Sequence, residues 1–171
     1  LGTIAALGVS RLPMAKRPRV TVFACGDEVI PHDQALRPGL IRDSNSVMLS
    51  AAIIAAGGEA HSAGILRDDF NAFVSAVRTA LNKSDMLVIS GGTAASGGDF
   101  ISNVVRDVGE LLVDGVPMRS GRPIIMGIAD GKPIVCVAGH PPEALRGFRL
   151  FGVAALNRLL GRDAPLPEDN A

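Results

Sequence analysis

Strand-type and helix-type segments alternate along the first two thirds of this chain, and this alternation restricts its possible folds more than any other feature. Runs of apolar or β-branched residues at 19–24 and 85–89 predict strands, and 59–66, which follows the Gly57-Gly58 helix end, gives a third with a weaker pattern. Between them, apolar residues recur with helical spacing at 44–56 and 70–81. Strands that are joined through helices pair in parallel and are covered by those helices. The pattern therefore predicts an α/β fold with a largely parallel sheet.

The last third of the chain has a different pattern. Short β-type runs follow a helix expected near 101–108; they lie at 111–116, 123–128 and 133–137. Asp130-Gly131 between the last two runs is a tight-hairpin signal, so this part of the sheet is expected to be antiparallel. A final long helix is predicted over 143–160.

Composition excludes several functional classes. Hydrophobic residues make up 47% and charged residues 20% of the 171 residues, which predicts a packed globule of one domain. Seventeen basic and 17 acidic residues cancel, and the chain has no Trp or Tyr, so we expect no nucleic-acid partner. No apolar stretch is long enough to span a bilayer, so we expect no membrane partner either.

The two ends and the two cysteines bear on the cellular context. The apolar start at 1–9 lacks the basic region and the cleavage site of a signal peptide, and the first residue is Leu; we expect a segment of a longer polypeptide. Cys25 and Cys136 both lie in apolar runs, which predicts buried free thiols and a cytoplasmic protein.

The stretch from Ser90 to Asp99 carries the strongest functional signal. It follows the apolar run 85–89 directly and contains four glycines with hydroxyl and carboxylate side chains. In open α/β sheets, ligands bind beyond the carboxyl ends of the strands, where glycine lets backbone N–H groups approach an anion. The alternative is a glycine-rich turn that only connects a strand to a helix.

Three further clusters could carry chemistry. Asp27 and Glu28 follow the first strand, and adjacent carboxylates can hold a hydrated Mg²⁺. The run 42–46 begins a helix, where Asp and Ser are also ordinary N-caps. Arg119 and Arg122 bracket a turn, and two guanidiniums could clamp a phosphate unless they are simply solvated.

Taken in order, these clusters resemble the molybdopterin-binding domain of molybdenum-cofactor biosynthesis proteins. The segments that carry the resemblance are 26–28 (GDE), 39–46 (GLIRDSNS), 90–99, 115–123 (GVPMRSGRP) and 139–141 (GHP). Within that group the chain is most similar to the molybdenum insertases, of the MoeA and gephyrin E-domain type. The resemblance extends over nearly the whole chain.

The resemblance implies a three-layer α/β/α sandwich with a mostly parallel mixed sheet over 19–161. It also implies linkers at 1–18 and 162–171, leading to other domains of a dimeric parent. Such proteins transfer molybdenum from molybdate to adenylated molybdopterin in a step that needs a divalent metal such as Mg²⁺.

By position, the resemblance makes Glu28, Asp43 and Asp99 the catalytic and metal-binding carboxylates. It implies ten residues that bind molybdopterin or its adenylate: Asn45, Ser90, Gly91, Gly92, Thr93, Ser96, Arg119, Arg122, Gly139 and Pro141.

The chain departs from the family pattern at several positions. A loop hydroxyl is replaced by Ala94, a proline by Ala138 and a small hydroxyl residue by Glu143. A carboxylate at position 143 opposes an anion such as molybdate by Coulomb repulsion. Two alternatives therefore stay open: an adenylyltransferase or nucleotide pyrophosphatase of the same superfamily, or a molybdopterin-binding scaffold without turnover.

Overall fold

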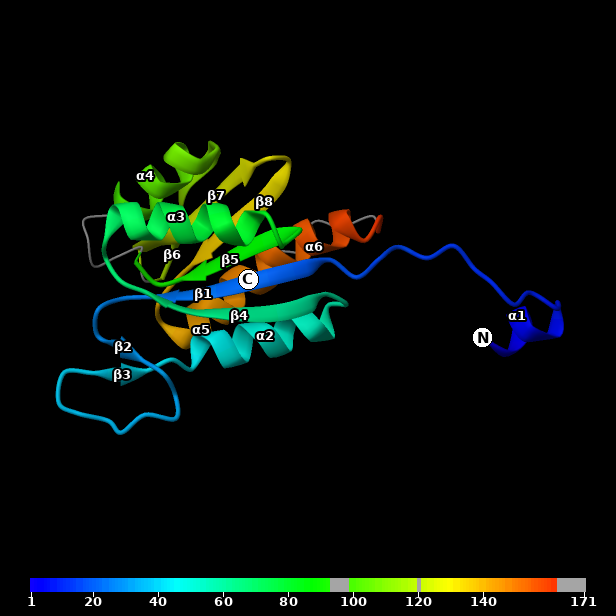
Figure 1. Cartoon of the computed structure of the whole chain (residues 1–171), viewed down its shortest axis with the longest axis horizontal. Coiled ribbons are helices and arrows are strands. Elements are labelled where there is room, and N and C mark those ends of the chain that lie inside the picture. The colour runs from blue at the N-terminus through cyan, green and yellow to red at the C-terminus, as the bar shows by residue number, and fades with distance from the viewer. Residues whose placement is uncertain (93–98, 120, 163–171) are drawn as a thin grey trace.

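A six-stranded mixed sheet forms the centre of the molecule in the computed structural model, which describes residues 1–92, 99–119 and 121–162 (Figure 1). The strand order is β4-β1-β5-β8-β7-β6. The strands are β1 (Arg19–Cys25), β4 (Glu59–Leu66), β5 (Met86–Ser90), β6 (Glu110–Met118), β7 (Gly121–Ala129) and β8 (Lys132–Val137). Strands β4, β1, β5 and β8 pair in parallel, and β7 is antiparallel to both β8 and β6.

Helices cover both faces of the sheet, so the fold has three layers. The helices are α1 (Gly2–Ala6), α2 (Asn45–Ala55), α3 (Phe70–Leu81), α4 (Asp99–Val108), α5 (Pro141–Gly147), the π-helical turn η1 (Phe148–Gly152) and α6 (Val153–Leu159). On one face α3 and α4 pack against alternate strand residues such as Leu87 and Ile89. On the other face α2, α5, η1 and α6 pack against the intervening ones, such as Met86 and Val88. Successive side chains of the central strands thus point to opposite faces of the sheet and pack into two separate hydrophobic cores.

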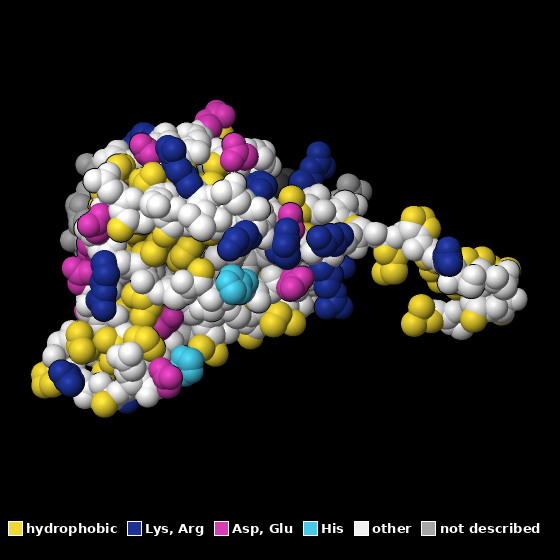
Figure 2. All heavy atoms as spheres, viewed as in Figure 1, with side chains coloured by type: hydrophobic (Ala, Val, Ile, Leu, Met, Phe, Trp, Pro, Cys, Tyr) yellow, Lys and Arg dark blue, Asp and Glu magenta, His cyan; other side chains and the backbone are white. Residues whose placement is uncertain are grey.

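Two segments lie outside these layers. Residues 1–17 form an arm that carries α1 away from the body, with exposed apolar side chains such as Leu7 and Met14 (Figures 1 and 2). The short strands β2 (Val29–Ile30) and β3 (Ile41–Arg42) pair in parallel and form, with the loop between them, a flap near the carboxyl end of β1 (Figure 1). Within the described ranges, no helix is long and apolar enough to cross a membrane.

Most of the predicted elements are confirmed. The strand predicted at 59–66 is β4, and the hairpin at Asp130-Gly131 joins β7 to β8. Asp69 caps α3 by accepting a hydrogen bond from Ala72 N at 2.9 Å. The single helix predicted over 143–160 is wrong: the helical run begins at Pro141 and is divided by η1.

Strand β4 is an edge of the sheet, since β1 is its only strand partner among the described residues. Its ladder with β1 is irregular, because Ser62 pairs with Val22 whereas Ile65 pairs with Ala24. Ala63 and Gly64 therefore stand opposite Phe23 alone, which is a β-bulge on the edge strand.

Candidate functional site

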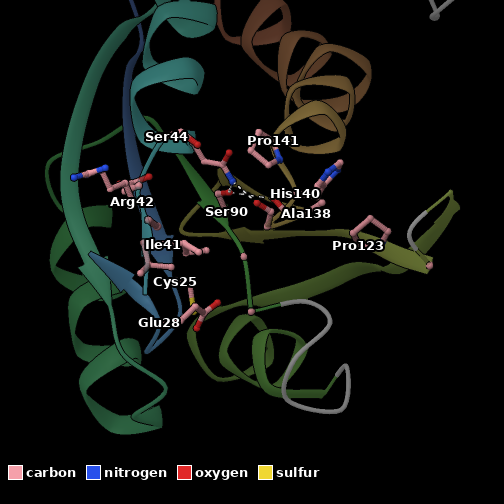
Figure 3. Close-up of a pocket in the computed structure, with 18 of the residues that line it drawn as sticks. Cys25, Glu28, Ile41, Arg42, Ser44, Ser90, Pro123, Ala138, His140 and Pro141 are labelled. Carbon is pink, nitrogen blue, oxygen red and sulfur yellow. Dashed lines mark hydrogen bonds between the residues drawn. The ribbon is translucent and has the colours of Figure 1, made fainter. Parts of the chain in front are cut away.

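A cavity of about 620 Å³ opens at the carboxyl ends of the central strands (Figure 3). We call it the first cavity. The ends of β1, β5 and β8, the flap, the start of α2 and the start of β7 all contribute to its wall. Its lining residues are Ala24, Cys25, Glu28, Val29, Ile41, Arg42, Asp43, Ser44, Asn45, Ser90, Gly91, Gly92, Gly121, Arg122, Pro123, Ala138, Gly139, His140 and Pro141.

The glycine turn after β5, Gly91-Gly92, contributes backbone atoms to the wall of this cavity. Gly91 has φ +97°, a conformation that L side chains rarely adopt, and its N–H donates to Val137 O at 3.1 Å. A Cβ at Gly91 would lie 2.5 Å from Cys25 O. The turn therefore passes against the end of β1 at a distance that only glycine permits.

Asn45 ties three loops together at the floor of the first cavity. Its Nδ2 donates to Ser90 Oγ and to Gly139 O, both at 2.7 Å. Ser90 Oγ in turn donates to Ala138 O at 3.1 Å. Because a carbonyl oxygen only accepts, the Gly139 contact fixes which end of the amide is nitrogen. Asn45 Oδ1 is then a buried acceptor with no partner among the described residues.

Two of the three predicted carboxylates line the first cavity. Asp43 is buried, and its Oδ1 accepts a hydrogen bond from Ser46 N at 2.9 Å, so it also caps α2. Glu28 is exposed where it lines the cavity, and its carboxylate makes no hydrogen bond or ion pair within the described part of the chain (Figure 3). Asp99 is the first residue of α4, and its side chain lies outside what the structure describes.

A divalent cation fits this donor set. No three His, Cys, Asp or Glu side chains come together among the described residues. Mg²⁺, however, is commonly held by one or two carboxylates together with phosphate oxygens and water. Glu28 and Asp43 both line the first cavity and supply such hard oxygen donors.

The two arginines of the predicted clamp lie in different cavities. Arg122 lines the first cavity, and its Nη2 donates to Gly115 O at 2.7 Å and to Asp114 O at 3.2 Å. Arg119 instead lines a second cavity, of about 800 Å³, on the other side of His140.

The structure brings most of the other predicted ligand-binding residues together. Asn45, Ser90, Gly91, Gly92, Gly139 and Pro141 all line the first cavity. Thr93 and Ser96 lie outside the described residues.

The flap supplies wall residues that the sequence did not indicate. Val29 and Ile41 are apolar and line the first cavity, as does Cys25 at the end of β1. The sequence signal for the flap is weak. The apolar residues Val29-Ile30 and Ile41 flank the loop 31–40, and segments this short show no periodicity.

Both cysteines are buried free thiols, as predicted. Burial and, next, the nearby Asp68 carboxylate raise the pKa of the Cys25 thiol to about 12. Its Sγ lies 3.5 Å from Asp68 Oδ1. Burial also raises the pKa of Cys136.

We expect iodoacetamide to alkylate Cys25 very slowly, although this residue lines a cavity. The thiolate is the reactive form, and at pH 8 a thiol with a pKa of about 12 is about 1,000-fold less ionised than one at the usual 9.0. Peptide mass spectrometry at increasing pH, beside the urea-unfolded chain, measures this rate. Labelling of the folded chain within tenfold of the unfolded rate would contradict the expectation.

The layered sheet and the first cavity define an α/β ligand-binding domain that presents backbone, amide and carboxylate groups to a polar ligand. The family model described as "Probable molybdopterin binding domain" matches residues 21–158. This chain therefore belongs to the molybdopterin-binding domain family of molybdenum cofactor biosynthesis.

Individual relatives agree with this membership. The molybdopterin molybdenumtransferase of Staphylococcus epidermidis is 27% identical over 169 residues, which are 98% of this chain and 40% of that protein. The solved molybdopterin biosynthesis MoeA protein from Pyrococcus horikoshii is 34% identical with a TM-score of 0.85, over 95% of this chain and 40% of that one.

A more distant solved structure is similar in fold alone. A molybdopterin biosynthesis protein from Mycobacterium abscessus is 18% identical with a TM-score of 0.67, over 83% of this chain and 94% of that one. By contrast, this chain spans only 40% of the length of the Staphylococcus epidermidis transferase.

Proposed function

We propose that this chain is the pterin-binding domain of a protein of the molybdopterin molybdenumtransferase type, and that its first cavity binds molybdopterin or adenylated molybdopterin. One observation carries the proposal. The glycine turn, the Asn45 amide and two carboxylates converge on one cavity at the carboxyl ends of the parallel strands. That edge is where α/β sheets bind ligands, and similarity to transferases over nearly the whole chain supports the same ligand class.

The groups in the first cavity have complementary tasks. The backbone of Gly91 and Gly92 lets a phosphate approach closely, and Asn45 Oδ1 offers an acceptor at the cavity floor for an N–H donor of the ligand. Glu28 and Asp43, with Asp99, would hold Mg²⁺, which neutralises phosphate charge when bound. Arg122 adds a positive charge on the β7 side.

We also propose that residues 1–18 and 162–171 are linkers to other domains of a dimeric, molybdate-dependent parent. The arm supports the first of these, because its apolar side chains are exposed and cover no part of the described body.

Glu28→Gln is expected to weaken binding of adenylated molybdopterin about tenfold in the presence of Mg²⁺, about 1.4 kcal/mol, and to change it little without Mg²⁺. The carboxylate is exposed and unpaired within the described residues, so its loss removes a metal ligand without disturbing packing. Anaerobic calorimetry with and without Mg²⁺ measures the difference.

The matched control is Glu59→Gln, which removes an exposed carboxylate at the start of β4, outside the first cavity. Equal weakening by both variants, or no Mg²⁺ dependence in the wild type, would exclude Glu28 as a metal ligand. Absence of binding by the folded wild-type chain and by its parent would refute the proposed ligand.

A binding scaffold without turnover is the second candidate. Ala138 lines the first cavity and Glu143 the second, which are two of the positions where the chain departs from the family pattern. Molybdate-dependent release of AMP from adenylated molybdopterin by the parent would exclude this candidate.

A further inference from the structure

A tight turn sets the position of the Glu28 carboxylate. Residues 26–29 form a β-turn, which is closed by a hydrogen bond from Val29 N to Gly26 O at 3.2 Å. Glu28 is the third residue of this turn, and its side chain folds back over the first: a Cβ at Gly26 would lie 2.7 Å from Glu28 Oε2 and 2.8 Å from Oε1. On the flap side, Ile41 N donates to Glu28 O at 2.9 Å. The place of the carboxylate in the first cavity therefore depends on the conformation of the turn.

The peptide group between Asp27 and Glu28 is the part of the turn that can rotate. Type I and type II turns differ by a flip of this central peptide, and the type II form needs a positive φ at the third residue. Among the described non-glycine residues only Asp130 has a positive φ, so Glu28 has a negative one, as in a type I turn. A flip of the central peptide would change the φ of Glu28 and turn its side chain in another direction.

Arg67, in the loop after β4, holds this central peptide. Its Nη1 donates a hydrogen bond to Asp27 O, which is the carbonyl of the peptide in question, and lies 4.0 Å from Asp27 Oδ1. The exposed ion pair contributes little by itself, but a charge-assisted hydrogen bond to a carbonyl opposes rotation of that group. The same loop is tied to the turn at a second point, because Gly26 N donates to Leu66 O at 3.2 Å.

We propose that Arg67 is a positioning residue, which directs the Glu28 carboxylate into the first cavity by fixing the Asp27–Glu28 peptide. The inference rests on the proposed function, in which Glu28 is a ligand of Mg²⁺. Arg67 does not line the first cavity; it lines a separate cavity of about 430 Å³. It therefore acts through the turn and not by contact with the ligand.

The charge of Arg67 alone would have the opposite effect. Removal of a cation near a metal site reduces the repulsion of Mg²⁺ and would strengthen Mg²⁺-dependent binding. Loss of a positioning contact instead leaves the Glu28 carboxylate free to adopt other directions, and ordering it again on binding costs affinity. The direction of the change thus separates the two effects.

The experiment is anaerobic calorimetric titration of the chain with adenylated molybdopterin, with and without Mg²⁺. Arg67→Gln is expected to weaken Mg²⁺-dependent binding about fivefold, because the ordering cost of Glu28 then falls on the binding step. Arg67→Lys keeps a cationic donor and is expected to bind within about twofold of the wild type. In the Glu28→Gln chain, adding Arg67→Gln is expected to change affinity by less than about twofold, since the positioned carboxylate is gone.

The matched control is Arg78→Gln. Arg78 makes the same kind of contact on α3, where its Nη2 donates to Asp107 O and to Asp107 Oδ1, both at 3.0 Å, and it does not line the first cavity. We expect its loss to leave affinity unchanged. The Arg67 side chain is 55% exposed, so its variants are expected to fold, which circular dichroism checks.

Three results would overturn the inference alone, given a wild type that binds with Mg²⁺ dependence. They are unchanged or tighter binding by Arg67→Gln, binding by Arg67→Lys no better than by Arg67→Gln, and an equal effect of Arg67→Gln in the Glu28→Gln chain. Absence of Mg²⁺-dependent binding in the wild type would instead refute the proposed metal site, and the inference with it.

Discussion

Gly91→Ala is expected to lower the free energy of unfolding by about 3 kcal/mol or more and to abolish ligand binding in the first cavity. An L side chain in left-handed backbone costs about 1–2 kcal/mol, and here the new Cβ would also meet Cys25 O at 2.5 Å. That oxygen belongs to the last residue of β1, which the sheet holds in place on both sides. The turn must move, and the backbone wall of the cavity moves with it. Denaturant unfolding and calorimetry measure the two effects.

Gly131→Ala separates the clash from the backbone strain. Gly131 also has positive φ, +72°, but a Cβ there meets nothing within 4 Å. We expect this variant to lose only the backbone contribution of about 1–2 kcal/mol and to keep its ligand affinity. If the two variants were equally destabilised, close approach to Cys25 would not be the reason for glycine at position 91.

Asn45→Asp is expected to destabilise the chain by about 3 kcal/mol and to weaken pterin binding more than Asn45→Ala does. The substitution is nearly isosteric, but it replaces the amide donor that contacts Ser90 and Gly139 at 2.7 Å with a carboxylate oxygen. That oxygen would face the Gly139 carbonyl in a buried position. Alanine loses the two hydrogen bonds without adding a charge, so we expect a loss of about 2 kcal/mol. Urea unfolding of the three proteins gives the order.

Asn103→Asp is the matched control for Asn45. Asn103 is exposed on α4, and its Oδ1 accepts a hydrogen bond from Arg106 at 3.1 Å. The same substitution keeps the acceptor there, and its effect is expected to stay within about 0.5 kcal/mol. If the Asn45→Asp variant had the same free energy of unfolding as the Asn45→Ala variant, the amide nitrogen would not face the Gly139 carbonyl.

The elements that the sequence predicted best are those with strong periodicity or clear end signals. Strand β4 has the predicted bounds, and β1 extends one residue beyond its prediction. Pro18 and Gly26 delimit the apolar run of β1, and Gly57-Gly58 marks the start of β4. The apolar stripe predicted over 70–81 comprises Phe70, Phe73, Val74, Val77 and Leu81; Phe73, Val77 and Leu81 are buried, Val74 is half-buried and Phe70 at the helix start is exposed. That the predicted site residues would meet in one cavity followed from a general rule: loops at the carboxyl ends of parallel strands converge.

The π-helical turn η1 could not be predicted from the sequence. Its wider i→i+5 hydrogen-bond pattern accompanies a local packing arrangement between Phe148 and Gly152. A Cβ at Gly152 would lie 2.2 Å from Phe148 Cδ2, so the Phe148 ring occupies the space left by this glycine. Apolar spacing alone is compatible with an uninterrupted helix over the same residues.

The separation of Arg119 from Arg122 was also beyond sequence reasoning. Arg119 lies in the turn directly after β6, whereas Arg122 belongs to β7, and the register of this hairpin shifts at several points between Leu111 and Met118. Each shift changes which face a side chain presents, so their spacing along the chain does not determine which cavity each one enters.

The bulge on β4 has a consequence for the solution behaviour of the chain. An edge strand offers a row of unpaired backbone groups to any other extended chain, and β4 carries only one charged residue, Glu59, to discourage such pairing. A regular ladder cannot continue past Ala63 and Gly64, because these two residues occupy the place of one. The irregularity that bends the strand thus acts as protection against sheet extension and aggregation at the exposed edge of the domain.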